Sequence, residues 1–182
     1  MTNPLESFVF STNIQKVLHF FLQRPTGRFY DREVSKLTGI SRAGTNFSLR
    51  DLTKAGFIQR EKRGRMLFYF INPEDPLIRQ LKIMQNVVLL YPLVRVLKKF
   101  CQKMVLYGSS AKGFNQEESD FDVWILSADK EKIRAMIHQN PISVRIQPMI
   151  QTPIEWILMG KNNEVFANQI ETGIVLWESH ES

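Results

Sequence analysis

Residues 106–126, LYGSSAKGFNQEESDFDVWIL, decide the fold of the second half of the chain. The runs Lys103–Leu106 and Asp122–Leu126 are mostly apolar and predict two short strands, with a Gly-Ser turn after the first. Alternate side chains of an extended strand share a face, so Asp120 and Asp122 should project together, roughly 6.5 Å apart along the chain. The sequence therefore predicts two carboxylates beside a glycine turn.

This pair of carboxylates predicts a magnesium site. Mg²⁺ prefers carboxylate oxygens together with substrate phosphates, so Asp120 and Asp122 are the candidate metal ligands. Two ions about 3.5–4 Å apart would clamp the oxygens of an in-line phosphoryl displacement, which makes both residues the candidate catalytic residues as well. The turn is the candidate phosphate site, because Gly108 allows close backbone approach and Ser109 and Ser110 supply donors at a helix start.

At these residues the chain resembles the DNA polymerase β-like nucleotidyltransferase superfamily, and its minimal prokaryotic members most closely. Those proteins carry a Gly-Ser turn, a spacer and an Asp-x-Asp strand, and Lys112-Gly113 stands where they usually carry Arg-Gly. The resemblance covers residues 100–178 and ends on the strand pattern of Glu171–Glu178. It implies a small α/β fold with a mixed sheet, one or two Mg²⁺ ions, and NTP as ligand or substrate near Lys112. The plainer alternative is a turn with two solvated aspartates.

One position departs from that family. Its minimal members carry a third carboxylate on a later strand, and within Ser143–Pro153 the matching residue is Gln147. In the family the third acid is thought to bind metal and to deprotonate the attacking hydroxyl, and an amide cannot act as that base. Alternatively Glu155, Glu117 or Glu118 substitutes, although Glu155 falls in a predicted helix. The sequence favours nucleotide and metal binding over catalysis, and whether the protein is an enzyme stays open.

Positive charge is concentrated in the first half of the chain. Residues 1–72 hold twelve Lys and Arg against five Asp and Glu, whereas residues 73–182 hold twelve against thirteen, which together give the net charge of +6. This asymmetry predicts an anionic partner for the first half.

The same half has the pattern of three helices and a basic hairpin. The helices are predicted from apolar spacing and capping residues, with Val34 and Leu37 inward in the second one. They span Thr12–Arg24, Tyr30–Thr38 and Ser41–Ala55. Strands at Phe57–Gln59 and Met66–Ile71 flank the basic turn Arg60–Arg65. Residues 9–72 resemble the winged helix-turn-helix regulators of the MarR and ArsR type, by pattern rather than by a unique motif.

A winged helix presents polar and basic side chains to the major groove from its recognition helix, and its wing reaches the neighbouring backbone. The candidate DNA-binding residues are Ser41, Arg42, Thr45, Asn46 and Arg50 on the exposed face of the third helix, with Lys62, Arg63 and Arg65 in the wing. The alternative is a protein–protein module, since charge runs are often solvated faces. The basic balance favours double-stranded DNA as the partner.

Residues 73–99 are predicted to form a connecting helix. Apolar residues alternate at spacings of four and three until Pro92 kinks or ends the helix. They are Leu77, Leu81, Met84, Val88 and Tyr91. A second stripe follows the proline and belongs to the next domain. Either both stripes pack within their own domains, or the first pairs with its twin in a homodimer, and the sequence leaves both open.

The composition favours a cytoplasmic protein without a membrane segment. Cys101 is the single cysteine, which excludes an intramolecular disulfide and a Cys-based zinc site and fits a reducing compartment. The N-terminus lacks a basic stretch with an apolar core, so no signal peptide is expected. The most apolar run, Val87–Val96, is too short to span a bilayer.

These patterns predict a mixed α/β protein with a winged helix at 9–72, a connecting helix at 73–99 and a nucleotidyltransferase-like domain at 100–178. The first function hypothesis is a DNA-binding protein whose second domain binds Mg-NTP and either transfers a nucleotidyl group to a hydroxyl acceptor or uses the nucleotide as a signal. The second is a transcriptional regulator whose inactive transferase-like domain serves as nucleotide sensor or interaction module. A third makes the first domain a docking site for a protein acceptor. Gln147 discriminates between the active and the inactive domain.

Overall fold

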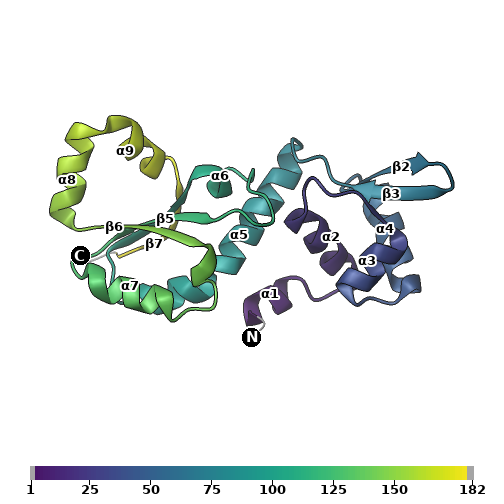
Figure 1. Cartoon of the computed structure of the whole chain (residues 1–182), viewed down its shortest axis with the longest axis horizontal. Coiled ribbons are helices and arrows are strands. Elements are labelled where there is room, and N and C mark those ends of the chain that lie inside the picture. The colour runs from purple at the N-terminus through teal and green to yellow at the C-terminus, as the bar shows by residue number, and fades with distance from the viewer. Residues whose placement is uncertain (1–2, 180–182) are drawn as a thin grey trace. The chain divides into compact units, whose positions relative to one another are not determined.

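Between Gln85 and Asn86 the chain passes from one folded unit to a second, and each unit has its own hydrophobic core. The structure is a computed structural model, and it describes residues 3–179. Helix α5 (Pro76–Leu97) belongs to both units, because its first half lies before this boundary and its second half after it (Figure 1). Within residues 3–179 no helix combines the length and hydropathy needed to cross a bilayer.

The N-terminal unit combines four helices with a small antiparallel sheet. The helices are α1 (Pro4–Val9), α2 (Asn13–Gln23), α3 (Asp31–Thr38) and α4 (Arg42–Lys54). The strands are β1 (Phe29–Tyr30), β2 (Gln59–Arg63) and β3 (Met66–Phe70), in the order β1-β3-β2. Thr12 begins α2 with a capping box, and the Ser41 side chain begins α4 by accepting from the Gly44 amide. The three helices predicted from the sequence are confirmed.

Two details of this unit differ from the predictions. Leu37 is 56% exposed, whereas Val34 is fully buried. Three residues turn a helix by about 300°, so Leu37 lies about 60° away from Val34, at the edge of the buried face. Strand β2 begins at Gln59, where the predicted strand Phe57–Gln59 ends, and runs to Arg63. It takes in most of the predicted basic turn, and Gly64, at φ 60°, closes the shorter turn that remains.

The C-terminal unit is built around a four-stranded mixed sheet. Its strands are β4 (Lys103–Tyr107), β5 (Phe121–Leu126), β6 (Ile146–Gln151) and β7 (Ile174–Glu178), in the order β6-β5-β4-β7. Strand β6 is parallel to β5, and the other pairs are antiparallel, so the predicted mixed sheet is confirmed. The helices are α6 (Gly108–Ala111), α7 (Lys130–His138), α8 (Pro153–Asn162) and α9 (Glu164–Glu171), with a 3-10 turn at Ser143–Arg145.

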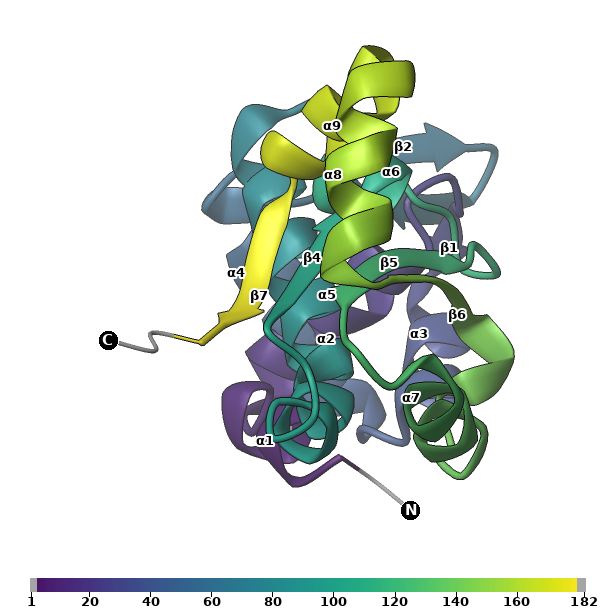
Figure 2. The ribbon, with the colours of Figure 1, turned by 90° about the vertical axis from the view of Figure 1, so that its left-hand side faces the viewer.

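Helices cover both faces of this sheet. The second half of α5 and α7 pack on one face, against Met104 and Val123, while α8 and α9 pack on the other, against Val105 and Trp124 (Figures 1 and 2). Because strand side chains alternate between the faces, Asp122 shares the face of Trp124.

Helix α5 runs through Pro92 to Leu97. Of the two effects predicted for this proline, an end of the helix is therefore wrong, and a kink stays a prediction. A proline inside a helix costs about 3 kcal/mol or more, and here the core offsets that cost by burying Leu90, Leu93 and Leu97. In the predicted seam, Leu77 and Met84 are exposed, whereas Val88 is buried. The homodimer stays a prediction.

Candidate functional site

Two carboxylates lie where strand β5 begins. Asp120 immediately precedes the strand, and Asp122 is its second residue. Burial raises the pKa of the Asp122 carboxyl, and the negative charge of Asp120 raises it further. The two carboxylates are therefore close enough to repel each other, and a cation between them would relieve this repulsion.

The glycine turn packs directly on the second carboxylate. Gly108 has φ 69°, and a Cβ atom built on it would lie 2.4 Å from Oδ2 of Asp122. Any side chain here would displace that carboxylate, so glycine brings the turn and the acid together. Ser109 and Lys112 are exposed beside it, in line with a role at a phosphate. Ser110 is fully buried instead, and its hydroxyl donates to the Asp120 carbonyl at 3.3 Å, so Ser110 positions the acid and cannot face a ligand.

Gln147 stands opposite the carboxylates on the neighbouring strand. It pairs with Asp122 in the parallel β5–β6 register, and its Nε2 donates a hydrogen bond of 2.7 Å to Oδ2 of Asp120. The alignment that matched Gln147 to the third acid of the minimal nucleotidyltransferases is therefore supported by its position, and an amide occupies that position.

The alternative third acids do not join the site. Glu155 lies in the first turn of α8, beyond the end of β6, where Gln151 pairs with Leu126. Hydrogen bonds from Lys130 at 2.8 and 3.0 Å and from the Thr152 backbone lower the pKa of Glu155 to about 2. Within residues 3–179 no group of three His, Cys, Asp or Glu side chains could hold a metal, so Glu117 and Glu118 do not complete one either.

Two buried amides and one arginine, none of them predicted, hold the site in place. Asn86 donates to the Ser110 carbonyl at 2.8 Å and to Oδ1 of Asn115 at 2.9 Å, and Asn115 donates back at 3.3 Å. Both asparagines are almost completely buried. Arg145 donates to the Ser119 carbonyl at 3.0 Å, next to Asp120. One indication of this support is present in the sequence, because Asn86 is a polar residue directly before the most apolar stretch, Val87–Val96.

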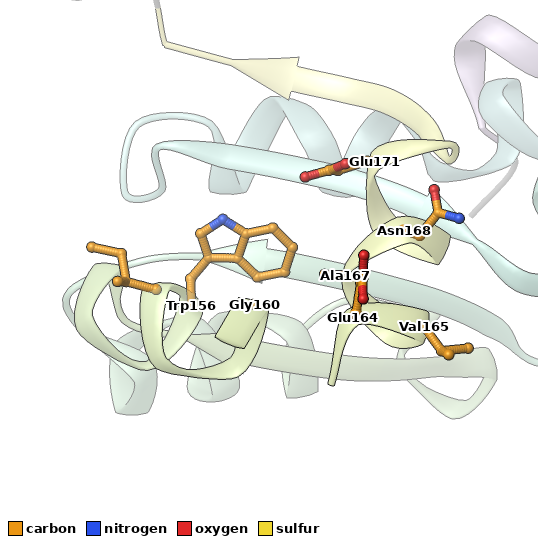
Figure 3. Close-up of a pocket in the computed structure, with 8 residues that line it drawn as sticks. Trp156, Gly160, Glu164, Val165, Ala167, Asn168 and Glu171 are labelled. Carbon is orange, nitrogen blue, oxygen red and sulfur yellow. The ribbon is translucent and has the colours of Figure 1, made fainter. Parts of the chain in front are cut away.

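Two cavities flank helix α9, and only one touches the turn. The smaller one, about 100 Å³, lies beside Gly108 and Lys112 and is closed by Gln169 and Gly173. The larger one, about 670 Å³, lies between α8 and α9, where Trp156 faces Asn168 and Glu171 (Figure 3). The lining of the larger cavity contains neither carboxylate nor any residue of the turn, so its size does not make it the reaction centre.

The predicted DNA-binding residues of the N-terminal unit are exposed, with one exception. The exposed ones are Ser41, Arg42, Asn46, Arg50, Lys62, Arg63 and Arg65. Thr45 is fully buried, and its hydroxyl donates to the Ile40 carbonyl at 3.4 Å, so the expectation that it faces solvent is wrong. Thr45 lies four and seven residues before Leu49 and Leu52, on the helix face that packs on the core.

Residues 93–182 match the family model described as Polymerase beta, Nucleotidyltransferase. The chain carries a nucleotidyltransferase-like domain. The matched residues include the glycine turn, both aspartates and Gln147. No curated protein matches the chain.

The residues of the nucleotidyltransferase-like domain fit the metal that such domains generally use, but only in part. Asp120 and Asp122 supply two carboxylates whose mutual repulsion a cation would relieve. Gly108 brings the backbone of the turn against the Asp122 carboxylate, so a phosphate held at the turn would lie beside a metal bound there. The third ligand of a two-metal arrangement is missing among residues 3–179, because Gln147 offers an amide in its place.

Proposed function

We propose that the nucleotidyltransferase-like domain binds a nucleoside triphosphate together with Mg²⁺. Asp120 and Asp122 would hold the metal, and the backbone of Gly108 and Ser109 would contact the phosphates, with Lys112 adding positive charge. The observation that carries this proposal is the contact of Gly108 with the Asp122 carboxylate. Bound Mg²⁺ would neutralise phosphate charge and polarise the phosphate that is attacked.

The same site makes nucleotidyl transfer to a hydroxyl acceptor weak. Gln147 cannot take a proton from the acceptor, and its hydrogen bond occupies Oδ2 of Asp120, an oxygen that a metal would otherwise use. General-base assistance typically contributes a factor of about 10²–10⁴ in rate. This geometry favours the second candidate function, in which the domain reports the presence of a nucleotide and catalyses little or no transfer.

The variant Gln147→Glu tests this choice, because it restores a carboxylate at the same side-chain length. Labelled NTPs are incubated with the parent protein and the variant, with Mg²⁺, DNA and cell extract. We expect the parent to bind nucleotide without labelling an acceptor, and the variant to label one. Gln147→Ala is the matched control, since it removes the amide without adding a charge. Robust labelling of an acceptor by the parent would contradict the sensor proposal and favour the enzyme.

We further propose that the N-terminal unit is a winged helix that binds double-stranded DNA. Helix α4 follows α2 and α3 in the order expected of a recognition helix, and the hairpin of β2 and β3 follows it as a wing. Arg42, Asn46 and Arg50 are exposed along α4. These positions would allow α4 to enter the major groove while the hairpin contacts the adjacent backbone.

Binding to random-sequence duplex over a range of salt concentrations tests the DNA proposal. Each phosphate contact contributes about −0.9 to the slope of log K against log salt, so we expect a steep decline. Arg42→Ala should change the sequence preference if Arg42 reads a base. Absence of binding to any duplex would favour the alternative in which this unit docks a protein acceptor.

A further inference from the structure

A cavity of about 570 Å³ lies between the beginnings of α3 and α4 and strand β3. Arg32 from α3, Arg42 from α4 and Arg65 from the turn before β3 all line it. Its volume falls within the range of about 300–1,000 Å³ that ligand pockets usually have. Three positively charged side chains from three separate segments of the sequence therefore line the same cavity.

The side chains of these three arginines have no partner among the described residues. Within residues 3–179 none of the three side chains forms a hydrogen bond, an ion pair or a ring contact. Arg63 behaves differently, because its Nε and Nη2 donate to the Glu61 carboxylate at 3.1 and 3.2 Å. Arg63 shares the Glu61 carboxylate with Arg28, whose Nη1 donates to it at 2.9 Å, whereas the side chains of the three cavity arginines pair with no carboxylate among residues 3–179.

The remaining lining indicates which ligand the cavity suits. Asp31 is the one acidic residue in the lining, so the three arginines leave a net charge of +2. Tyr30 and Tyr69 contribute aromatic walls with hydroxyl groups, and Asn46 adds a neutral donor and acceptor. Guanidinium groups have planar, forked donors that match the oxygens of a phosphate. The chemistry is that of a site for a phosphate joined to organic groups.

We infer that this cavity binds a backbone phosphodiester of a nucleic-acid strand, held by Arg32, Arg42 and Arg65. The inference rests on the proposed DNA-binding function, and it makes this cavity the main place where the N-terminal unit contacts the DNA backbone. A nucleic acid is the favoured source of the phosphate because Arg42 and Asn46 belong both to the cavity and to the exposed face of α4. Arg32, which the sequence analysis did not select, is thereby a binding residue.

The test compares Arg32→Gln and Arg65→Gln with Lys16→Gln in the full chain. Lys16→Gln is the control, because it removes an exposed positive charge of the same unit that does not line the cavity. One phosphate contact contributes about 0.9 to the salt slope, so we expect each cavity variant to reduce the slope by up to about 0.9 and to weaken duplex binding up to about eightfold at 0.1 M salt. Lys16→Gln should leave both quantities nearly unchanged. Thermal unfolding of the three variants verifies that each remains folded.

The outcomes separate this inference from the DNA proposal. If the parent protein binds no duplex at any salt concentration, the DNA proposal fails and the inference fails with it. If the parent binds with a steep slope but Arg32→Gln and Arg65→Gln keep that slope, only the cavity is wrong. Titration with tripolyphosphate tests a free ligand as the source of the phosphate. Binding that Arg32→Gln abolishes, with duplex binding unaffected, would overturn the nucleic-acid assignment.

Discussion

Replacing Gly108 by alanine should weaken nucleotide binding strongly while leaving the fold largely intact. The new Cβ would lie 2.4 Å from Oδ2 of Asp122, closer than real Cβ contacts. The atom in the way is the end of a short, rotatable side chain, so the protein can relieve the clash by turning the Asp122 carboxylate away. That movement takes one of two acidic groups out of the proposed metal site.

The magnitude follows from two separate costs. An alanine at φ 69° costs roughly 1–2 kcal/mol of folding free energy, because its Cβ is crowded in the left-handed region. Loss of a charged interaction costs about 1.5–3 kcal/mol, which weakens Mg-dependent NTP binding about 10- to 150-fold. Gly39→Ala isolates the first cost, since Gly39 also has φ 69° but a Cβ there would meet nothing within 4 Å.

Calorimetric titration with Mg-NTP and urea unfolding measure the two effects on the same preparations. We expect both alanine variants to lose similar stability and only Gly108→Ala to lose affinity for Mg-NTP. If Gly108→Ala binds Mg-NTP within about threefold of the parent, the assignment of the turn and Asp122 to one site is refuted. A large loss of affinity in Gly39→Ala would point to a general effect of destabilisation.

Three further outcomes are expected. Asn86→Ala should lower the free energy of unfolding by about 1–3 kcal/mol in urea titrations, because it leaves the buried Ser110 carbonyl without its donor. Burial raises the pKa of the Cys101 thiol from 9.0 to about 11, so the reactive thiolate is about 100-fold scarcer at pH 8 than for an unperturbed thiol. Alkylation of the folded protein, followed with a thiol reagent, should be slower by the same factor. If exposed residues of α5 form a homodimer, Leu77→Glu with Met84→Glu should convert it to monomer in sedimentation experiments without loss of thermal stability.

The sequence predicts the proximity of the carboxylate pair, because strand alternation is a local rule that places Asp120 and Asp122 on one face. Gln147 was found differently, through the resemblance to the minimal nucleotidyltransferases, whose third acid it replaces. Its register with Asp122 comes from the pairing of β5 and β6, which no local pattern fixes. The helices of the N-terminal unit follow local rules, as the carboxylate pair does, since capping residues and apolar spacing mark where each begins and ends.

Other features depend on contacts between distant residues and could not be predicted in this way. Asn86 and Asn115 pair across 29 positions of the chain, and the local sequence around either residue does not indicate its partner. The continuation of α5 through Pro92 depends on the core of the C-terminal unit, which overrides local propensity. The burial of Thr45, by contrast, could have been predicted, because Thr45 lies four residues before Leu49 on the same helix face. Its hydroxyl group led instead to the prediction that it is exposed.

The register between β5 and β6 limits where a third acid could come from. A slip of one residue would turn every side chain of β6 to the opposite face, so no neighbour of Gln147 can reach the aspartates without breaking the strand. Glu155 is held by Lys130 at the other end of β6, and residues 3–179 contain no third metal-binding acid near the pair. The position that holds the third acid in the minimal nucleotidyltransferases therefore offers no base here. A phosphate oxygen of the nucleotide or a group on the acceptor would have to act in its place, and a site of this kind would bind Mg-NTP more readily than it would transfer a nucleotidyl group.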